Sequence, residues 1–314
     1  MRNTKPVYSV VIPVYNSEKM LGELYDRLVQ VFDNVIKEQF EMILVDDASS
    51  DNSWHKMGEL REGDKRIKII RLAKNFGQHN ALMCGFNHIS GDFVITMDDD
   101  LQHPPEEIPK LITAIKRNPE IDAVMGRYNS KKHSWWRNLG TVIMRKIMAP
   151  ILRLDKKYKG SSFRLIRANI IQEMVKIETY QPRVGQLLLL VSKSYDSVPV
   201  RHDPRADGKS GYSIFRLTKD FINNILNNST VILRFTSIIG FSSAGLSMVL
   251  ALYYLIRFFT VGVAVSGFTT IVVINLFFSG IMLFSLGVVG EYLMKILFET
   301  KGYPQFVVKQ KELS

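Results

Sequence analysis

Two long stretches toward the C-terminal end carry no charged side chain. The first runs from Phe235 to Ile256 and the second from Phe258 to Gly290, with Arg257 between them. A helix needs about 20 consecutive apolar residues to cross the hydrocarbon core of a bilayer. Because small residues interrupt the start of the second stretch, we predict two transmembrane helices, at residues 235–257 and 269–291. The alternative is a buried hairpin in a soluble protein, where uncharged runs of this length are rare.

The orientation of the predicted spans follows from the basic residues around them. Lys and Arg are frequent before the first span and after the second, and the intervening loop has only Arg257 at its edge. The positive-inside rule then places both termini in the cytoplasm, with residues 292–314 as a cytoplasmic tail. The single cysteine, Cys84, excludes an internal disulfide and fits a reducing compartment.

The first two thirds of the chain alternate between apolar strand-like runs and helical segments. Strand-like runs occur at residues 8–16, 42–45, 67–72 and 93–95. Continuously apolar strands separated by helices predict an α/β fold with a mostly parallel, Rossmann-like sheet that is covered on both faces. The chain contains no G-x-G-x-x-G after the first strand and no G-x-x-x-x-G-K-[ST], so neither of these phosphate-binding motifs is used.

Three consecutive carboxylates, Asp98, Asp99 and Asp100, follow the apolar run Phe93–Ile95. Adjacent carboxylates repel one another, and a fold that gathers them at a strand end usually supplies a cation. Taken alone, a solvated acidic turn is an equally good interpretation. Polar clusters also follow two other strands, at residues 13–16 and 46–51. In parallel sheets ligands bind at the carboxyl ends of the strands, so we expect the three clusters to converge on one site.

The segment before the first span is basic. The net charge of the chain is +11, which fits a membrane surface, phosphorylated ligands or nucleic acid. Residues 201–212 combine basic, glycine and hydroxyl residues, and we favour an anion-binding loop over a solvated linker. Residues 213–234 are predicted to form an amphipathic helix along the membrane interface. For the stretch 134–154, a helix on the membrane surface and an ordinary core helix remain equally good interpretations.

Several motifs together resemble glycosyltransferase family 2. They are V-I-P-V-Y-N at 11–16, D-D-A-S-S-D at 46–51, N-F-G-Q at 75–78 and D-D-D-L-Q-H-P-P at 98–105. R-x-x-G-x-S-x-Y at 205–212, the two spans and G-E-Y at 290–292 make the chain similar to the polyprenyl-phosphate glycosyltransferases. That group contains dolichyl-phosphate mannose synthase, bacterial glucosyl carrier enzymes and undecaprenyl-phosphate aminoarabinose transferase.

The resemblance implies a GT-A catalytic domain at 1–212, a nucleotide-sugar donor (with uridine as the expected base), Mg²⁺ or Mn²⁺, and a polyprenyl (undecaprenyl) phosphate acceptor. It further implies an inverting transferase of the bacterial inner membrane, acting in cell-envelope modification, and a homo-oligomer; nucleic acid is not an implied partner. The residues implied to contact the donor are Pro13, Tyr15, Asn16, Asp46, Asp47, Asp98, Asp99 and Gln102. The metal ligands are Asp98 and Asp100. Arg205, Lys209, Ser210 and Tyr212 are implied to contact the phosphates of the donor or the lipid. Asp100, Ser162, Arg164 and Arg205 form the implied catalytic set.

Some features qualify these expectations. Asp99 lies between the two metal ligands. Because alternate residues of an extended segment point to opposite sides, we expect its side chain to point away from the ion. Many family members have an acidic residue where Asn16 stands, and an Asp, taken as the catalytic base, where Ser162 stands. A serine needs an activating partner to act as a base, yet a phosphate acceptor with a second pKa near ~6 is already ionised at neutral pH. We expect His79 and His103 to flank the site rather than bind the ion.

Two other functions remain open. A polysaccharide synthase of the same family would carry a Q-x-x-R-W motif, but the chain contains no Arg-Trp pair. An inactive membrane scaffold derived from a transferase is suggested by Ser162, whereas the Asp98–Asp100 pair and the basic loop argue against it.

Overall fold

The computed structural model describes residues 6–128, 161–203 and 267–313, together with isolated residues between 236 and 260. The chain divides into two compact units. The first consists of residues 1–138, 155–209 and 303–314, and the second of residues 139–154 and 210–302.

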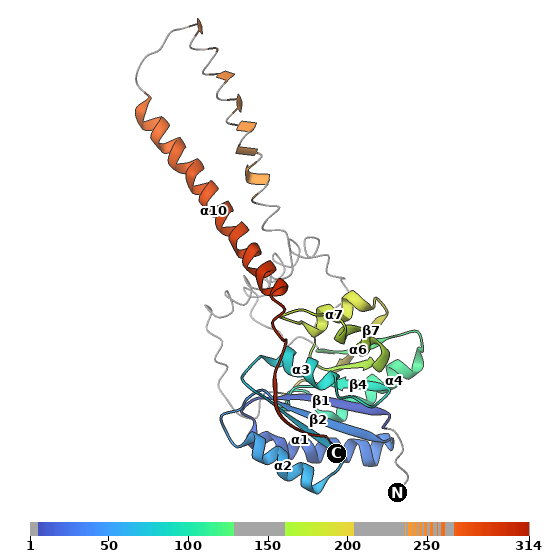
Figure 1. The fold of residues 1–314 in the computed structure, drawn as a ribbon. Coiled ribbons are helices and arrows are strands. Elements are labelled where there is room, and N and C mark those ends of the chain that lie inside the picture. Colours follow the sequence, from blue (N-terminus) through green and yellow to red (C-terminus); the bar gives the residue numbers. More distant parts are fainter. Residues whose placement is uncertain are drawn as a thin grey trace. The chain divides into compact units, whose positions relative to one another are not determined.

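The first unit is built on one eight-stranded sheet, in the order β7-β5-β6-β4-β1-β2-β3-β8 (Figure 1). Its strands are β1 Tyr8–Val14, β2 Phe40–Asp46, β3 Ile67–Leu72, β4 Phe93–Thr96, β5 Ala123–Tyr128, β6 Arg164–Arg167, β7 Tyr195–Val200 and β8 Val308–Glu312. Strands β4, β1, β2 and β3 are parallel, whereas β6 is antiparallel to both β4 and β5, and β8 is antiparallel to β3. The predicted α/β fold with a mostly parallel sheet is confirmed.

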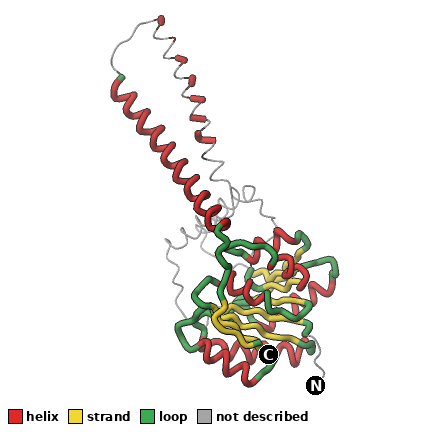
Figure 2. Tube along the Cα trace, viewed as in Figure 1, coloured by secondary structure: helices red, strands yellow, loops and turns green. Residues whose placement is uncertain are grey.

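Helices cover both faces of this sheet (Figure 2). Their bounds are α1 Glu18–Gln30, the π-helical turn η1 Val31–Ile36, α2 Ser53–Gly63, α3 Gln78–Phe86, the short 3₁₀ turn η2 Pro105–Glu107, α4 Ile108–Arg117, α6 Ala168–Val175 and α7 Val184–Val191. One core layer lies between the sheet and α1, α2 and α4, and the other lies between the sheet and α3, α6 and α7. Since both faces are covered, every residue of β1 and β2 is buried.

The C-terminal residues return to the sheet. Strand β8 pairs with β3, Phe306 and Val308 pack against the core under α3, and Glu312 forms an ion pair of 3.2 Å with Arg61. Residues 292–314, predicted as a tail, therefore comprise the end of helix α10 and an edge strand of the eight-stranded sheet. Strand β8 is short and contains two lysines, so its sequence lacks the apolar pattern that predicts a strand.

The second unit contains α10, Phe268–Thr300. Within α10, the stretch Phe277–Thr300 is long and apolar enough to cross a membrane, and it is the one such helix in the part of the chain that the structure describes. The second predicted span, 269–291, thus falls inside a longer helix. Of the first predicted span, 235–257, the structure describes only isolated residues, each of them helical. The predicted helices at 134–154 and 213–234 lie outside the described residues.

Candidate functional site

The polar clusters that follow β1, β2 and β4 meet at one edge of the sheet. These three strands are neighbours and parallel, so their carboxyl ends lie side by side. A cavity of about 900 Å³ opens there. Its lining includes Pro13, Tyr15, Asn16, Asp47, Asp51, Gly77, Gln78, Asp98, Asp99 and Asp100. The three polar clusters therefore converge on one cavity, as predicted.

The backbone at this edge adopts an unusual conformation. Asn16, Ala48 and Leu101 have φ angles of 53°, 58° and 57°, although none of them is glycine. The left-handed region costs a residue with a side chain roughly 1–2 kcal/mol. One such residue follows each of the three strands that line the cavity. Strain of this kind persists where the surrounding structure enforces it, and it is common at ligand sites.

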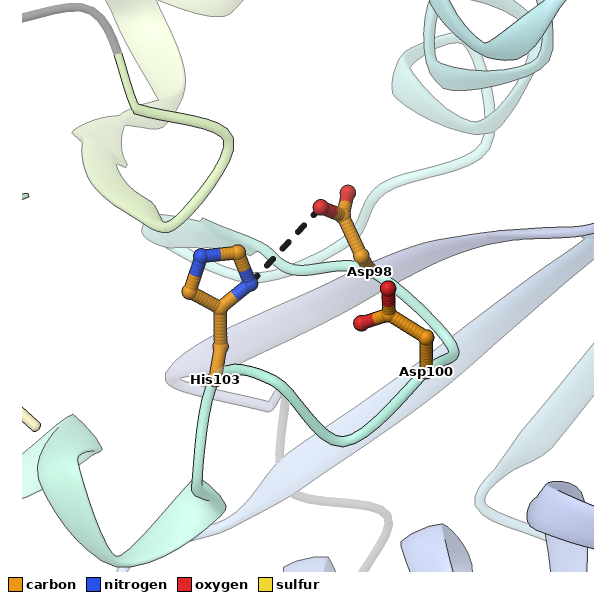
Figure 3. Close-up of side chains that lie close together, drawn as sticks. All are labelled: Asp98, Asp100 and His103. Atoms are coloured by element: carbon orange, nitrogen blue, oxygen red, sulfur yellow. Dashed lines mark ion pairs between the residues drawn. The ribbon is translucent and has the colours of Figure 1, made fainter. Parts of the chain in front are cut away.

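Asp98, Asp100 and His103 form a group that can hold a metal ion (Figure 3). One ligand atom from each lies within 4.8 Å of the others, and His103 Nδ1 is 3.7 Å from Asp98 Oδ2. Ligands about 2.1 Å from an ion are at most about 4.2 Å apart, so small side-chain rotations suffice to bind one. Carboxylate oxygens suit both Mg²⁺ and Mn²⁺, and an imidazole nitrogen favours the transition metal Mn²⁺ over Mg²⁺.

His103, expected from the sequence to flank the site, lies close enough to Asp98 and Asp100 to be a third candidate ligand. His103 is 3% exposed, and its ring stacks on Phe163 with ring centroids 5.5 Å apart. Burial lowers the pKa of His103, which keeps its imidazole in the neutral form that binds metals. The signal in the sequence for a possible ligand was that His103 follows the aspartates within the same short loop. The sequence could not show that Leu101, with its positive φ, turns the loop back.

Asp98 is held by residues from two other elements. Gln78, at the start of α3, donates from Nε2 to Asp98 Oδ1 at 2.5 Å, and Ser162 donates from Oγ to Asp98 Oδ2 at 2.6 Å. Thr96 fixes Ser162 in turn by donating to its carbonyl oxygen at 2.6 Å. Both oxygens of Asp98 thus accept a hydrogen bond, which orients the carboxylate. The sequence alone did not indicate this role for Gln78 or Ser162.

Two other aspartates hold the loops around the cavity. Asp99 accepts hydrogen bonds from Ser17 Oγ and from Tyr15 N, and so ties the loop after β1 to the loop after β4. Burial raises the pKa of Asp99 to about 6, against the effect of those hydrogen bonds. Asp47 accepts from Phe76 N at 2.7 Å and Gly77 N at 2.8 Å, while burial raises its pKa. The carboxylate of Asp99 is thus engaged by the loop that follows β1.

The remaining predicted residues occupy different positions. Asp46 is fully buried, accepts from Ser49 N and pairs with Arg71 at 3.1 Å, so it lies beneath the cavity lining rather than in it. Gln102 donates a hydrogen bond from its backbone N–H to Asp100 Oδ1. Arg164 is 5% exposed, at the start of β6 opposite Thr96. Asn16 accepts from Ser50 N at 2.8 Å. Arg205, Lys209, Ser210 and Tyr212 lie outside the described residues.

The fold and the site define a class: an α/β protein with a metal-binding carboxylate pair beside a polar cavity at the carboxyl edge of its sheet. The family model for glycosyl transferase family 2 matches residues 9–175, which is more than half of the chain. The chain belongs to glycosyltransferase family 2, and the resemblance found in its motifs is confirmed at this level.

Solved structures agree with this fold. Glucosyl-3-phosphoglycerate synthase from Mycobacterium tuberculosis, in complex with Mn²⁺, UDP and glucosyl-3-phosphoglycerate, is 16% identical with a TM-score of 0.51. The match covers 71% of this chain and 80% of that one. The mannosyltransferase PcManGT from Pyrobaculum calidifontis, with GDP-Man and Mn²⁺, is 16% identical with a TM-score of 0.48. That match covers 69% of this chain and 61% of that one, so this chain spans about three fifths of its length.

Proposed function

We propose that this protein transfers a sugar from a nucleotide-sugar donor to a polyprenyl phosphate at the cytoplasmic face of a bacterial inner membrane. The observation that carries the proposal is the metal-binding group Asp98, Asp100 and His103 beside the cavity at the sheet edge, in a family 2 chain. A donor nucleotide would lie in the cavity, with its diphosphate toward these residues and its base toward Pro13 and Tyr15.

A divalent ion at Asp98, Asp100 and His103 would supply Lewis acidity to the departing nucleoside diphosphate. The chain's own part is to hold that group in place. Gln78 and Ser162 orient Asp98, and Asp99 holds the β1 loop, whose Tyr15 lines the donor cavity. Mn²⁺ or Mg²⁺ is the expected cofactor. Mn²⁺ accompanies the nucleotide in the synthase and in the mannosyltransferase compared above.

The acceptor needs no general base in this proposal. A phosphate monoester is already ionised at neutral pH, so its oxygen attacks the anomeric carbon directly and the configuration inverts. Ser162 Oγ donates its hydrogen to Asp98, so its proton is engaged and it orients a ligand rather than accepting a proton. Arg164 and the predicted loop residues Arg205, Lys209, Ser210 and Tyr212 are proposed to bind the phosphates. Asp203, near the start of that loop, donates from its N–H to Gln102 O at 3.1 Å.

Helix α10 supports the membrane part of the proposal. Large apolar side chains on its surface are exposed, among them Phe277, Met282, Phe284 and Leu293, and almost none of Phe277–Thr300 is buried within the protein. Exposed apolar surface on this scale requires lipid or a protein partner. We assign it to lipid, and we propose two spans with both termini cytoplasmic. Such an anchor would give the enzyme access to an acceptor in the bilayer. We also propose that the protein assembles into a homo-oligomer.

The test is transfer by the purified full-length chain in liposomes that contain undecaprenyl phosphate. Radiolabelled UDP- and GDP-sugars are supplied one at a time with Mn²⁺ or Mg²⁺, and lipid-extractable label is counted. We expect one donor to label the lipid, no label with undecaprenol, and loss of transfer in Asp100→Asn but not in the surface control Asp33→Asn. Nucleotide binding without labelling by any donor would favour the inactive scaffold, and label in a water-soluble polymer would favour a polysaccharide synthase.

A further inference from the structure

The three residues that follow β7, Arg201 to Asp203, are attached to the metal-binding loop at both ends. Arg201 N donates to Glu107 Oε2 at 3.1 Å, and Asp203 N donates to Gln102 O at 3.1 Å. Arg201 Nε also lies 3.3 Å from Asp203 Oδ1 within the segment. Gln102 and Glu107 belong to the stretch that follows Asp100. The segment is therefore fixed to this stretch on either side of His202.

His202, the middle residue, contacts the candidate metal ligand His103. Their ring centroids are 5.6 Å apart with an interplanar angle of 52°. His103 also stacks on Phe163, with an interplanar angle of 15°. Two rings from different parts of the chain thus restrict the imidazole of His103. Its orientation matters, because only a nitrogen directed toward Asp98 and Asp100 can share an ion with them.

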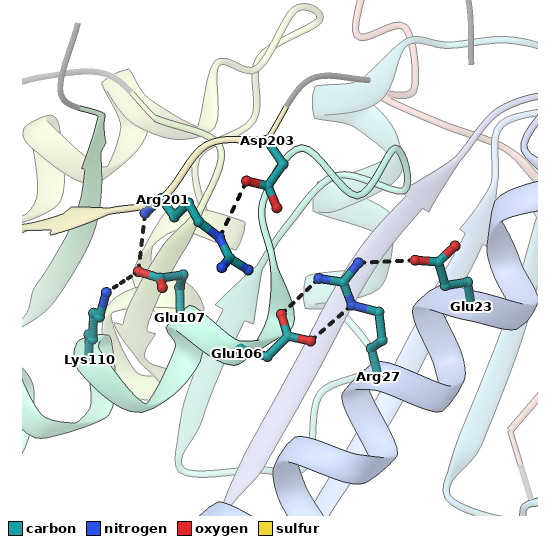
Figure 4. Close-up of polar contacts among 7 residues, drawn as sticks. All are labelled: Glu23, Arg27, Glu106, Glu107, Lys110, Arg201 and Asp203. Atoms are coloured by element: carbon teal, nitrogen blue, oxygen red, sulfur yellow. Dashed lines mark hydrogen bonds and ion pairs between the residues drawn. The ribbon is translucent and has the colours of Figure 1, made fainter. Parts of the chain in front are cut away.

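Glu107 is the group that holds this segment from the side of α4. It is 7% exposed, and its Oε2 accepts from Lys110 Nζ at 2.5 Å as well as from Arg201 N (Figure 4). Burial of a carboxylate is energetically costly unless the group is ion-paired and hydrogen-bonded. The two contacts of Glu107 offset that cost, so we expect its side chain to stay in this position. One carboxylate oxygen thereby joins the start of α4 to a backbone N–H that lies 94 residues later in the chain.

The preceding residue, Glu106, makes a different set of contacts. It binds Arg27 of α1 through two hydrogen bonds of 2.9 and 2.8 Å, and Arg27 also pairs with Glu23 (Figure 4). The side chain of Glu106 is 44% exposed, against 9% for Glu107. The two glutamates are adjacent and both are ion-paired. Glu107 accepts a hydrogen bond from the segment beside His103, whereas Glu106 is influenced by that segment through the charge of Arg201.

We propose that Glu107 is a positioning residue for the metal site. Through the backbone of Arg201 it holds His202 against His103, and so it keeps the imidazole of His103 directed toward Asp98 and Asp100. The proposal rests on the proposed metal-dependent function, but it concerns ion binding alone and needs neither sugar nor lipid. Residues that orient metal ligands typically change metal affinity by about 10–100-fold when they are removed.

The experiment measures Mn²⁺ binding to the full-length protein by titration of the electron paramagnetic resonance signal of the free ion. We expect the dissociation constant to rise about 10-fold in Glu107→Ala. It should rise less in Glu107→Gln, which keeps an oxygen that can accept from Arg201 N. Glu106→Ala is the matched control and should bind Mn²⁺ like the wild type. Amide hydrogen exchange over residues 201–203 should increase in Glu107→Ala only.

A second pair of variants keeps the test decisive if Glu107→Ala fails to fold. His202→Ala should weaken Mn²⁺ binding similarly, and His202→Phe should restore it, since phenylalanine retains a ring against His103 but cannot bind an ion. The proposal is overturned if Glu107→Ala and Glu106→Ala bind Mn²⁺ equally, or if His202→Ala binds it like the wild type. If the variants change Mn²⁺ binding as expected but the wild type transfers no sugar, the proposed function is overturned and this inference stands.

Discussion

Substitution of Ser162 by alanine should weaken metal binding without damaging the fold. Ser162 Oγ donates to Asp98 Oδ2 at 2.6 Å. The backbone carbonyl of Ser162 accepts from the hydroxyl of Thr96, and alanine preserves that contact. Removing the hydroxyl therefore releases one oxygen of Asp98 while the strand end stays in place. The perturbation isolates the orientation of a single ligand.

The size of the effect follows from the hydrogen bonds to Asp98. A hydrogen bond to a charged group contributes about 1.5–3 kcal/mol. Gln78 still holds Asp98 Oδ1 at 2.5 Å, so only part of the orientation is lost. We expect the lower end of that range, which corresponds to an increase of roughly 10-fold in the Mn²⁺ dissociation constant. Isothermal titration calorimetry with Mn²⁺ and no nucleotide measures it directly.

The neighbouring Ser161 provides the control. Its Oγ accepts from Phe163 N at 3.1 Å within its own turn. Ser161→Ala should leave the affinity for Mn²⁺ unchanged. The reasoning fails if Ser162→Ala binds Mn²⁺ as tightly as the wild type, or if Ser161→Ala weakens binding equally. In the double variant Ser162→Ala, Gln78→Ala, the loss should exceed that of either single change, because both oxygens of Asp98 are then released.

Three further predictions concern the fold and its pH dependence. Gly91→Ala should lower the melting temperature, since an added Cβ would lie 2.8 Å from Ser9 N; Gly63→Ala, which meets nothing within 4 Å, is the control, and equal melting temperatures would contradict the packing. Deletion of residues 303–314 removes β8 and should lower the urea midpoint, and an unchanged midpoint would show that β8 adds nothing to the sheet. Burial lowers the pKa of His79 from 6.5 to about 4, so between these values the unfolded chain binds more protons and stability falls as pH falls. His79→Gln should flatten this slope in urea unfolding from pH 7 to pH 4, and an unaltered slope would refute the assignment.

Much of the sheet was readable from local pattern. Strands β1 and β2 are buried on both faces, so they appear as uninterrupted apolar runs, and the polar residues that follow them mark the site edge. Strand β8 could not be found in this way. Its sequence, Val308 to Glu312, is mostly charged and polar, and only its pairing with β3 makes it a strand.

The site was predictable in composition more than in detail. The spacing of Asp98 and Asp100 pointed to a bound ion. The sequence did not indicate that His103 is a third candidate ligand for this ion, or that Gln78 donates a hydrogen bond to Asp98. Asp46 appeared to be a cavity residue, whereas its carboxylate lies beneath the lining and pairs with Arg71. Side-chain direction at a strand end depends on the turn that follows, and the positive φ at Ala48 and Leu101 cannot be read from residue type.

The sequence by itself determined the α/β class, the edge of the sheet that carries the site and the two carboxylates at its centre, because strand periodicity and strand-end composition are local properties. Only the tertiary structure decided which side chains complete that centre. His103, Gln78 and Ser162 come to Asp98 from a loop, a helix start and the beginning of another strand, and Glu107 reaches a segment 94 residues away. Such contacts arise from the packing of distant segments, which leaves no periodic pattern in the sequence.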